Sequence, residues 1–105
     1  GNVINNGVIT NLPYDACVEV PCLVDGEGIH PTFVGALPLQ LAAMNSSNIY
    51  AQMLTIEAAH TMDKKKIYQA AMMDPHTGAE LSTDEIVAMC DELFEAHEKA
   101  GYPVF

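Results

Sequence analysis

Arginine is absent from this 105-residue chain, and positive charge is scarce. Four lysines (Lys64, Lys65, Lys66 and Lys99) stand against fourteen aspartates and glutamates, which gives a net charge of −10 at pH 7. Because contact with phosphates requires a basic surface, this balance excludes binding to nucleic acid and to anionic membranes. The lack of arginine also excludes a bidentate guanidinium clamp on a carboxylate or phosphate.

Cysteine is also sparse, and its count is odd. Cys17, Cys22 and Cys90 cannot form a complete set of disulfides, so we expect a reducing compartment, the cytoplasm. In a regular strand, Cys17 and Cys22 would lie on opposite faces and neither bridge nor share a metal. No apolar run approaches the roughly 20 residues of a membrane span. The chain starts without Met or a basic signal region, so we expect a fragment of a longer protein.

What the sequence does contain is globular: half of its residues are apolar and 17% are charged. The length predicts a single domain over residues 1–105. Strand patterns come first. Asn5-Asn6-Gly7 between Val3-Ile4 and Val8-Ile9 predicts a hairpin, and residues 16–24 alternate as a strand, with Pro21 marking an edge or bulge. A turn at residues 25–28 and a strand over 29–34 follow. The sequence thus predicts antiparallel strands over about 3–34.

After Gly35 the apolar residues recur at the spacing of a helix. The pattern predicts helices over about 38–62 (one broken helix or two joined), 64–73 and 82–100, with His76–Glu80 as a loop. Asp63 is the expected N-cap of the second helix, and Ser82 with Glu85 forms a capping box for the last. The predicted fold class is therefore α+β, with N-terminal antiparallel strands followed by packed helices.

Few residues suggest chemistry. Glu57-Ala58-Ala59-His60 is a single E-x-x-H, whereas di-iron bundles need two, so a helical contact is favoured. The histidines lack ligand spacing: we expect His76 exposed in a loop and His97 partly buried on an apolar stripe. Gly26 and Gly28 form a plain turn, because Pro31 occupies the third position of a phosphate-binding G-x-G-x-x-G.

Three further features have structural interpretations. Glu19 is expected at a strand edge, and Lys64–Lys66 on a solvated face. The helical methionines predict core filling or a subunit interface; they are Met44, Met53, Met62, Met72, Met73 and Met89. From its residues alone, the chain is thus a small acidic α+β domain with no active site of its own.

Several runs together resemble a known family. They are Asn11-Leu12-Pro13, Val18-Glu19-Val20-Pro21-Cys22-Leu23-Val24-Asp25, Gly28-Ile29-His30-Pro31-Thr32, Gly35-Ala36-Leu37-Pro38, Ala70-Ala71-Met72-Met73-Asp74-Pro75-His76-Thr77 and Asp84-Glu85-Ile86. In this order they resemble the C-terminal part of family-4 glycoside hydrolases, most closely the α-galactosidases (melibiases). The resemblance implies that this chain folds as the last part of a C-terminal domain like that of lactate and malate dehydrogenases.

The resemblance also implies an activity for a parent enzyme. Such enzymes use NAD and a divalent metal, usually Mn2+: the sugar is oxidised at C3, loses a proton at C2, eliminates the aglycone, adds water and is reduced again. The segments that carry the family's cofactor, metal and catalytic residues do not match this chain. We therefore assign no catalytic, cofactor-binding or metal residue here and expect the fragment to be inactive.

The expected partners are the rest of the parent enzyme, an α-galactoside bound by the parent only, and further copies in a homo-oligomer. Two alternatives remain open: a fragment of a family-4 α-glucosidase or α-glucuronidase, and a non-enzymatic interaction module. An upstream reading frame with G-x-G-x-x-[GS] would favour the enzyme over the module.

We predict that the isolated chain self-associates, because separating a domain from its enzyme exposes the apolar surface that met the other part. The candidate surfaces are the Met-rich helices and the strand edge near Glu19. Repulsion from the charge of −10 is screened beyond about 8 Å at physiological salt. Light scattering that gives a clean monomer at high protein concentration would contradict this prediction.

Overall fold

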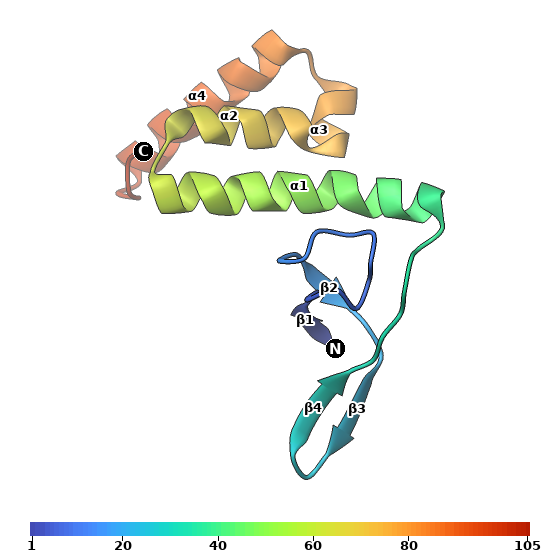
Figure 1. Cartoon of the computed structure of the whole chain (residues 1–105). Coiled ribbons are helices and arrows are strands. Elements are labelled where there is room, and N and C mark those ends of the chain that lie inside the picture. Colours follow the sequence, from blue (N-terminus) through green and yellow to red (C-terminus); the bar gives the residue numbers. More distant parts are fainter. The chain divides into compact units, whose positions relative to one another are not determined.

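The computed structural model describes all residues from Gly1 to Phe105. Contacts divide the chain into two compact units, Gly1–Ile49 and Tyr50–Phe105. The first unit contains four short strands, and the second contains packed helices (Figure 1). Helix α1 (Leu39–Thr61) begins in the first unit and ends in the second. The predicted α+β class, with antiparallel strands preceding helices, is confirmed.

The strands of the first unit form two separate antiparallel pairs. β1 (Asn2–Ile4) pairs with β2 (Cys17–Glu19), and β3 (Cys22–Asp25) pairs with β4 (Gly28–Pro31). The single strand predicted over residues 16–24 is thus wrong, because the chain changes partner at Val20–Pro21. Proline has no N–H to continue a ladder, so the interruption falls where the sequence placed an edge or bulge. The turn predicted at 25–28 is confirmed, and the last strand ends at Pro31, before the expected Val34.

The hairpin predicted between Val3-Ile4 and Val8-Ile9 is wrong in its partner but right in its turn. Asn6 and Gly7 both have positive φ, 46° and 86°, and the N–H of Val8 donates to the carbonyl of Asn5 at 2.9 Å. This is the conformation that Asn-Gly favours. The chain then leaves the turn to form an isolated parallel bridge between Ile9 and Gly35, while β1 pairs with β2 instead.

A buried asparagine side chain holds the loop between β1 and β2. Asn5 is fully buried, and its Oδ1 accepts from the N–H of Ile9 at 2.8 Å. Its Nδ2 donates to the carbonyls of Ile9 (2.9 Å), Leu12 (3.1 Å) and Pro13 (2.9 Å). These bonds satisfy backbone groups that no strand partner reaches. The apolar core beside them is small and consists of Ile9, Ala16, Val18 and Val20.

Helix α1 runs without a break from Leu39 to Thr61, so the helix predicted over about 38–62 is present but the predicted break or junction is wrong. The polar run Asn45–Asn48 is mostly exposed on the helix, where Ser47 Oγ and Asn48 Nδ2 both donate to the Met44 carbonyl. None of the helices combines the length and apolarity needed to cross a membrane. Asp63 caps α2 (Lys64–Met73) as predicted, because its side chain accepts from the N–H of Lys65.

The segment predicted as a loop at His76–Glu80 is instead helix α3 (Pro75–Glu80). Asp74 is its N-cap: one carboxylate oxygen accepts from both the N–H and the hydroxyl of Thr77, each at 2.8 Å. Pro75 occupies the first helical position, where its fixed φ suits the helix and its missing N–H costs nothing. The same Asp-Pro pair therefore ends α2 and starts α3.

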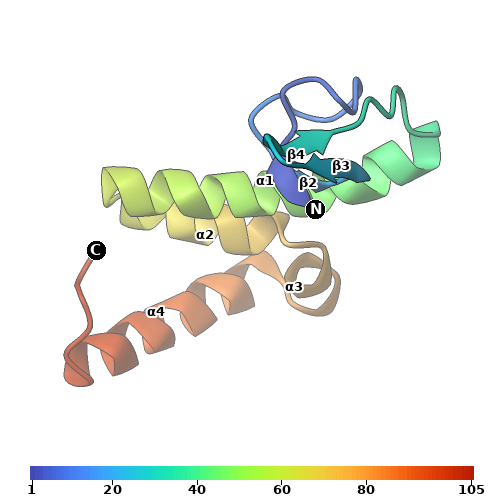
Figure 2. The same ribbon diagram turned by 90° about the horizontal axis from the view of Figure 1, so that it is seen from below.

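The last helix, α4 (Thr83–Lys99), begins with the predicted capping box of Ser82 and Glu85. It ends in a Schellman motif, in which Gly101 has φ 82° and the N–H of Tyr102 donates to the His97 carbonyl. Figure 2 shows α4 beside α2, with α3 between them in the chain. The buried face of α4 holds Ile86 and Cys90.

We predict that Asn5→Ala lowers the free energy of unfolding by about 3 kcal/mol, because it leaves the buried N–H of Ile9 without its partner and removes three further hydrogen bonds. The matched control is Asn11→Ala. Asn11 also makes two hydrogen bonds, to the N–H and carbonyl of Leu37, but it is exposed and water can replace them. The control should lose about 1 kcal/mol or less in urea unfolding. Equal losses for the two variants would contradict the assigned role of Asn5.

Candidate functional site

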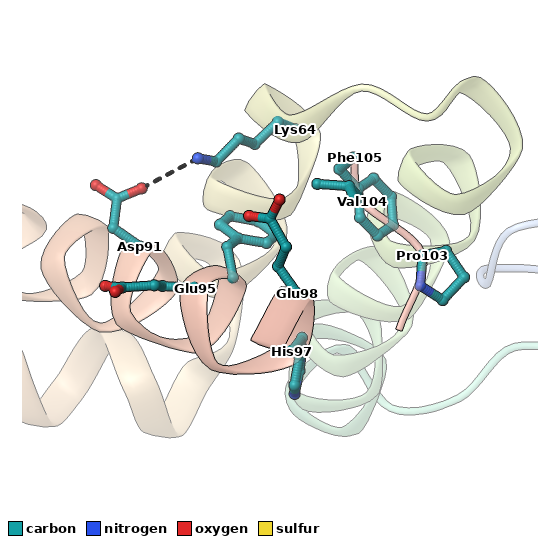
Figure 3. A pocket seen from close by; sticks show the side chains of 9 residues that line it. Lys64, Asp91, Glu95, His97, Glu98, Pro103, Val104 and Phe105 are labelled. Carbon is teal, nitrogen blue, oxygen red and sulfur yellow. Dashed lines mark ion pairs between the residues drawn. The ribbon is translucent and has the colours of Figure 1, made fainter. Parts of the chain in front are cut away.

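A cluster of charged and aromatic side chains joins α2 to α4 in the second unit. Lys64 Nζ lies 3.4 Å from Asp91 Oδ1, and the Tyr68 hydroxyl donates to the same oxygen. The Lys64 ammonium also lies over the ring of Phe94, 4.6 Å from its centroid. Figure 3 shows Lys64 reaching toward Asp91. One ammonium is thus shared between a carboxylate and an aromatic face, a pairing that holds both helices together.

The three polar groups perturb one another's pKa values. The hydrogen bond from Tyr68 lowers the pKa of Asp91, and Lys64 lowers it further. The same bond to Asp91 raises the pKa of Tyr68, and its partial desolvation adds to the increase. The hydrogen bond with Tyr68 raises the pKa of Lys64. At neutral pH the carboxylate and ammonium are both ionised and the phenol is neutral.

A cavity of about 270 Å3 lies beside this cluster, between the end of α4 and the C-terminal residues (Figure 3). Phe105 packs against Phe94 at 6.2 Å between ring centroids. The acidic side chains that line the cavity are Asp91, Glu95 and Glu98. Its only lysine is already paired with Asp91, so the cavity offers no free cation for a phosphate or carboxylate. Its lining contains no nucleophile with an adjacent base.

The Glu57–His60 pair does not form a ligand set. Glu57 lies within ion-pair distance of Lys66, whose side chain is 23% exposed, and His60 is exposed. The prediction that Lys64–Lys66 form a solvated face is therefore wrong for Lys64 and Lys66. Both are partly buried and ion-paired, whereas Lys65 is exposed.

The other histidines are scattered over the surface. His30 lies 3.0 Å from Asp25, across the turn of the β3–β4 hairpin. His76 is exposed as predicted, although it lies in α3 and not in a loop. The prediction that His97 is partly buried is wrong: it is exposed and contacts the Tyr102 ring at 5.5 Å. The histidine, cysteine, aspartate and glutamate side chains nowhere form a group of three that could hold a metal.

The cysteines, Glu19 and the methionines occupy different environments. All three cysteines are free: Cys17 is exposed, Cys22 is half-buried and Cys90 is buried. Glu19 is exposed on β2, as predicted for an edge residue. None of the six methionines is buried, so core filling is wrong as their common role. Met44, Met62 and Met73 are exposed, which leaves the interface interpretation open.

Sequence reasoning missed the Lys64–Asp91–Tyr68 cluster because Asp91 lies 23 positions from Tyr68 and 27 from Lys64, on a different helix. No local pattern reports such a pairing. By contrast, a local signal for α3 was present, since Asp-Pro-His-Thr combines an N-cap with proline at the first helical position.

Comparison with known proteins decides the family. The Family 4 glycosyl hydrolase C-terminal domain matches residues 1–77. This chain belongs to family 4 of the glycosyl hydrolases. An α-galactosidase of Bacillus subtilis (strain 168) is 60% identical over 97 residues, and an α-galactosidase of Rhizobium meliloti (strain 1021) is 41% identical over 98 residues. These alignments cover 92% and 93% of the chain but only 22% and 20% of the relatives, so the chain spans about a fifth of their length.

Solved family 4 structures share the fold. A crystal structure of 6-phospho-α-glucosidase from gut microorganisms, in complex with NAD and glucose-6-phosphate, is 31% identical. It has a TM-score of 0.85, covering 99% of this chain and 23% of that one. A second 6-phospho-α-glucosidase structure, in complex with NAD and Mn2+, matches with a TM-score of 0.86 at 21% identity. It covers the same shares and supports the fold alone.

We predict that Tyr68→Phe removes an ionisation above the ordinary tyrosine pKa of 10.0 from the ultraviolet titration of tyrosinate. Asp91→Asn should shift that ionisation to lower pH, because it removes the carboxylate that holds the phenol neutral. Since the pKa of Tyr68 is raised in the folded state, its contribution to stability is complete below 10 and lost as pH rises through the raised value.

The same titration of Tyr14→Phe is the control, since Tyr14 is exposed and lies in the other unit. An unchanged profile in Asp91→Asn would contradict the assigned coupling between Asp91 and Tyr68.

Proposed function

We propose that this chain is the C-terminal domain of an α-galactosidase that hydrolyses α-galactosides with NAD and Mn2+. The observation that carries the proposal is the 60% identity to a curated α-galactosidase over 92% of the chain. The 41% identity to a second α-galactosidase, from another organism, supports the same substrate class. In this proposal, residues 1–105 act as one domain of a longer, cytoplasmic glycosidase.

The residues of this chain do not fit either cofactor. Metal binding needs several converging ligands, and no three histidine, cysteine or acidic side chains converge. The Gly26–Glu27 turn joins two antiparallel strands, whereas a dinucleotide-binding turn joins a strand to a helix N-terminus. We therefore infer that the remaining polypeptide holds NAD and Mn2+, and we expect the isolated chain to be inactive.

The contribution of this domain is structural. Its two units bury few large side chains, and many large apolar residues remain exposed. Such surface is typical of a part that packs against the rest of an enzyme. We infer that it supports the catalytic part and contributes to subunit contacts in a homo-oligomer. The exposed Met62 and Met73 and the adjoining helices of the second unit are the candidate surface for those contacts.

A second candidate is a glucosidase of the same family that acts on phosphorylated sugars. The observation in its favour is the likeness to the 6-phospho-α-glucosidase bound to NAD and glucose-6-phosphate. Its identity of 31% is about half that of the Bacillus α-galactosidase, so the galactoside is the better-supported substrate. A non-enzymatic module is disfavoured by the same two likenesses.

We predict that the full-length parent cleaves an α-galactoside such as melibiose only with NAD, a divalent metal and a reducing agent. With substrate deuterated at C2 of the galactosyl ring, released galactose should lose deuterium in ordinary water. The reason is that the proposed elimination removes the C2 proton, which a two-carboxylate glycosidase does not touch. Full deuterium retention, or activity after NAD and metal are stripped, would contradict the mechanism.

The 105-residue chain is the control for this experiment. Calorimetry of the chain with NAD and Mn2+ should give no heat above dilution, because the residues that hold them lie outside it. A micromolar dissociation constant would overturn the assignment of both cofactors to the remaining polypeptide. Maltose 6′-phosphate, the substrate in the name of a Fusobacterium mortiferum relative, tests the second candidate as a parallel substrate.

A further inference from the structure

The β3–β4 hairpin has two chemically different faces. Its register pairs Val24 with Ile29 and Cys22 with Pro31, and alternation places these four side chains on one face. We call them the apolar hairpin face. The opposite face carries Leu23 and the ion pair between Asp25 and His30. Figure 1 shows the hairpin extending away from β1 and β2.

The central residues of the apolar hairpin face are largely exposed to solvent. Val24 is 69% exposed and Ile29, directly opposite, is 65% exposed. β3 and β4 form a sheet of only two strands, and such hairpins are marginally stable in water without a packing partner. Even so, four consecutive pairs maintain the ladder from Cys22 to Pro31. A partner that covers Val24 and Ile29 would supply the missing packing.

The charge of the first unit indicates the chemistry of this partner. Residues 1–49 contain four carboxylates (Asp15, Glu19, Asp25 and Glu27) and no lysine or arginine. Two copies meeting through this hairpin would bring like charges together around an apolar contact, which is unfavourable. The partner that complements it is an apolar surface bordered by Lys or Arg. About four fifths of the length of the α-galactosidase relatives lies outside the region that this chain matches.

We propose that the apolar hairpin face docks onto an apolar, Lys/Arg-bordered surface of the remaining polypeptide of the same parent enzyme. This inference rests on the proposed function, because it requires a longer parent. The contact is intramolecular, so it needs no oligomer and is distinct from subunit contacts made by the second unit. Docking buries Val24 and Ile29, whereas Leu23 on the other face stays accessible.

The experiment uses the full-length parent with the photo-reactive residue p-benzoylphenylalanine in place of Val24. The matched control places the same residue at Leu23, which is 63% exposed and adjacent on β3 but faces the other way. After irradiation, the Val24 variant should give an intramolecular cross-link to a peptide outside these 105 residues. Its yield should exceed that of the Leu23 variant several-fold.

Each other outcome overturns the proposal. A cross-linked dimer on a denaturing gel would show that a second copy covers the face. Equal yields at the two positions, or no cross-link at Val24, would show that the face is not covered selectively. If a bulky residue at position 24 prevents folding, Val24→Thr and Leu23→Thr replace the two photo-reactive variants. Docking then requires that only Val24→Thr lowers the melting temperature of the parent. Equal melting temperatures for the two variants would overturn the proposal.

NAD-dependent α-galactosidase activity is measured on the same preparations of wild-type parent. Activity without selective cross-linking would overturn the docking and leave the proposed function standing. Selective cross-linking in a parent that lacks this activity would support the docking and overturn the proposed function.

Discussion

The first unit depends on one buried amide. Asn5 is fully enclosed and forms hydrogen bonds with backbone groups from Ile9 to Pro13 that no strand reaches. Because of these bonds, the loop between β1 and β2 closes without regular secondary structure, and β1 can pair with β2 across it. The apolar core beside it is small, so the hydrogen bonds of Asn5 determine the shape of the loop more than hydrophobic burial does.

A second constraint is the separation of charge along the chain. All four lysines lie in the second unit, where Lys64 and Lys66 are held by Asp91 and Glu57. The first unit has acidic side chains but no lysine or arginine, and it displays an apolar hairpin face. One half of the domain therefore neutralises part of its own charge internally. The other half is complementary to a basic, apolar surface, consistent with a domain that covers a fifth of the length of its α-galactosidase relatives.

Local signals in the sequence predicted two helices and one turn correctly. Capping residues located α2 and α4, and Asn-Gly located the first turn, because each acts through its immediate neighbours. Strand partners were not predictable in this way. Val3 and Ile4 pair with residues 15 and 13 positions along the chain, and nothing local distinguishes that pairing from a hairpin. The exposure of His97 was also missed, because the stripe on α4 is buried only at Ile86 and Cys90. The Lys64–Asp91 cluster depends on helix packing alone.

The confinement of lysine to the second unit also has a practical consequence. Trypsin cleaves after Lys or Arg, and neither occurs before Lys64. Every strand, the Asn5 loop and the whole of α1 therefore stay together in one tryptic peptide from Gly1 to Lys64, folded or not. Resistance to trypsin thus carries no information about whether the first unit is folded, and a protease that cuts at acidic residues is needed to follow its unfolding.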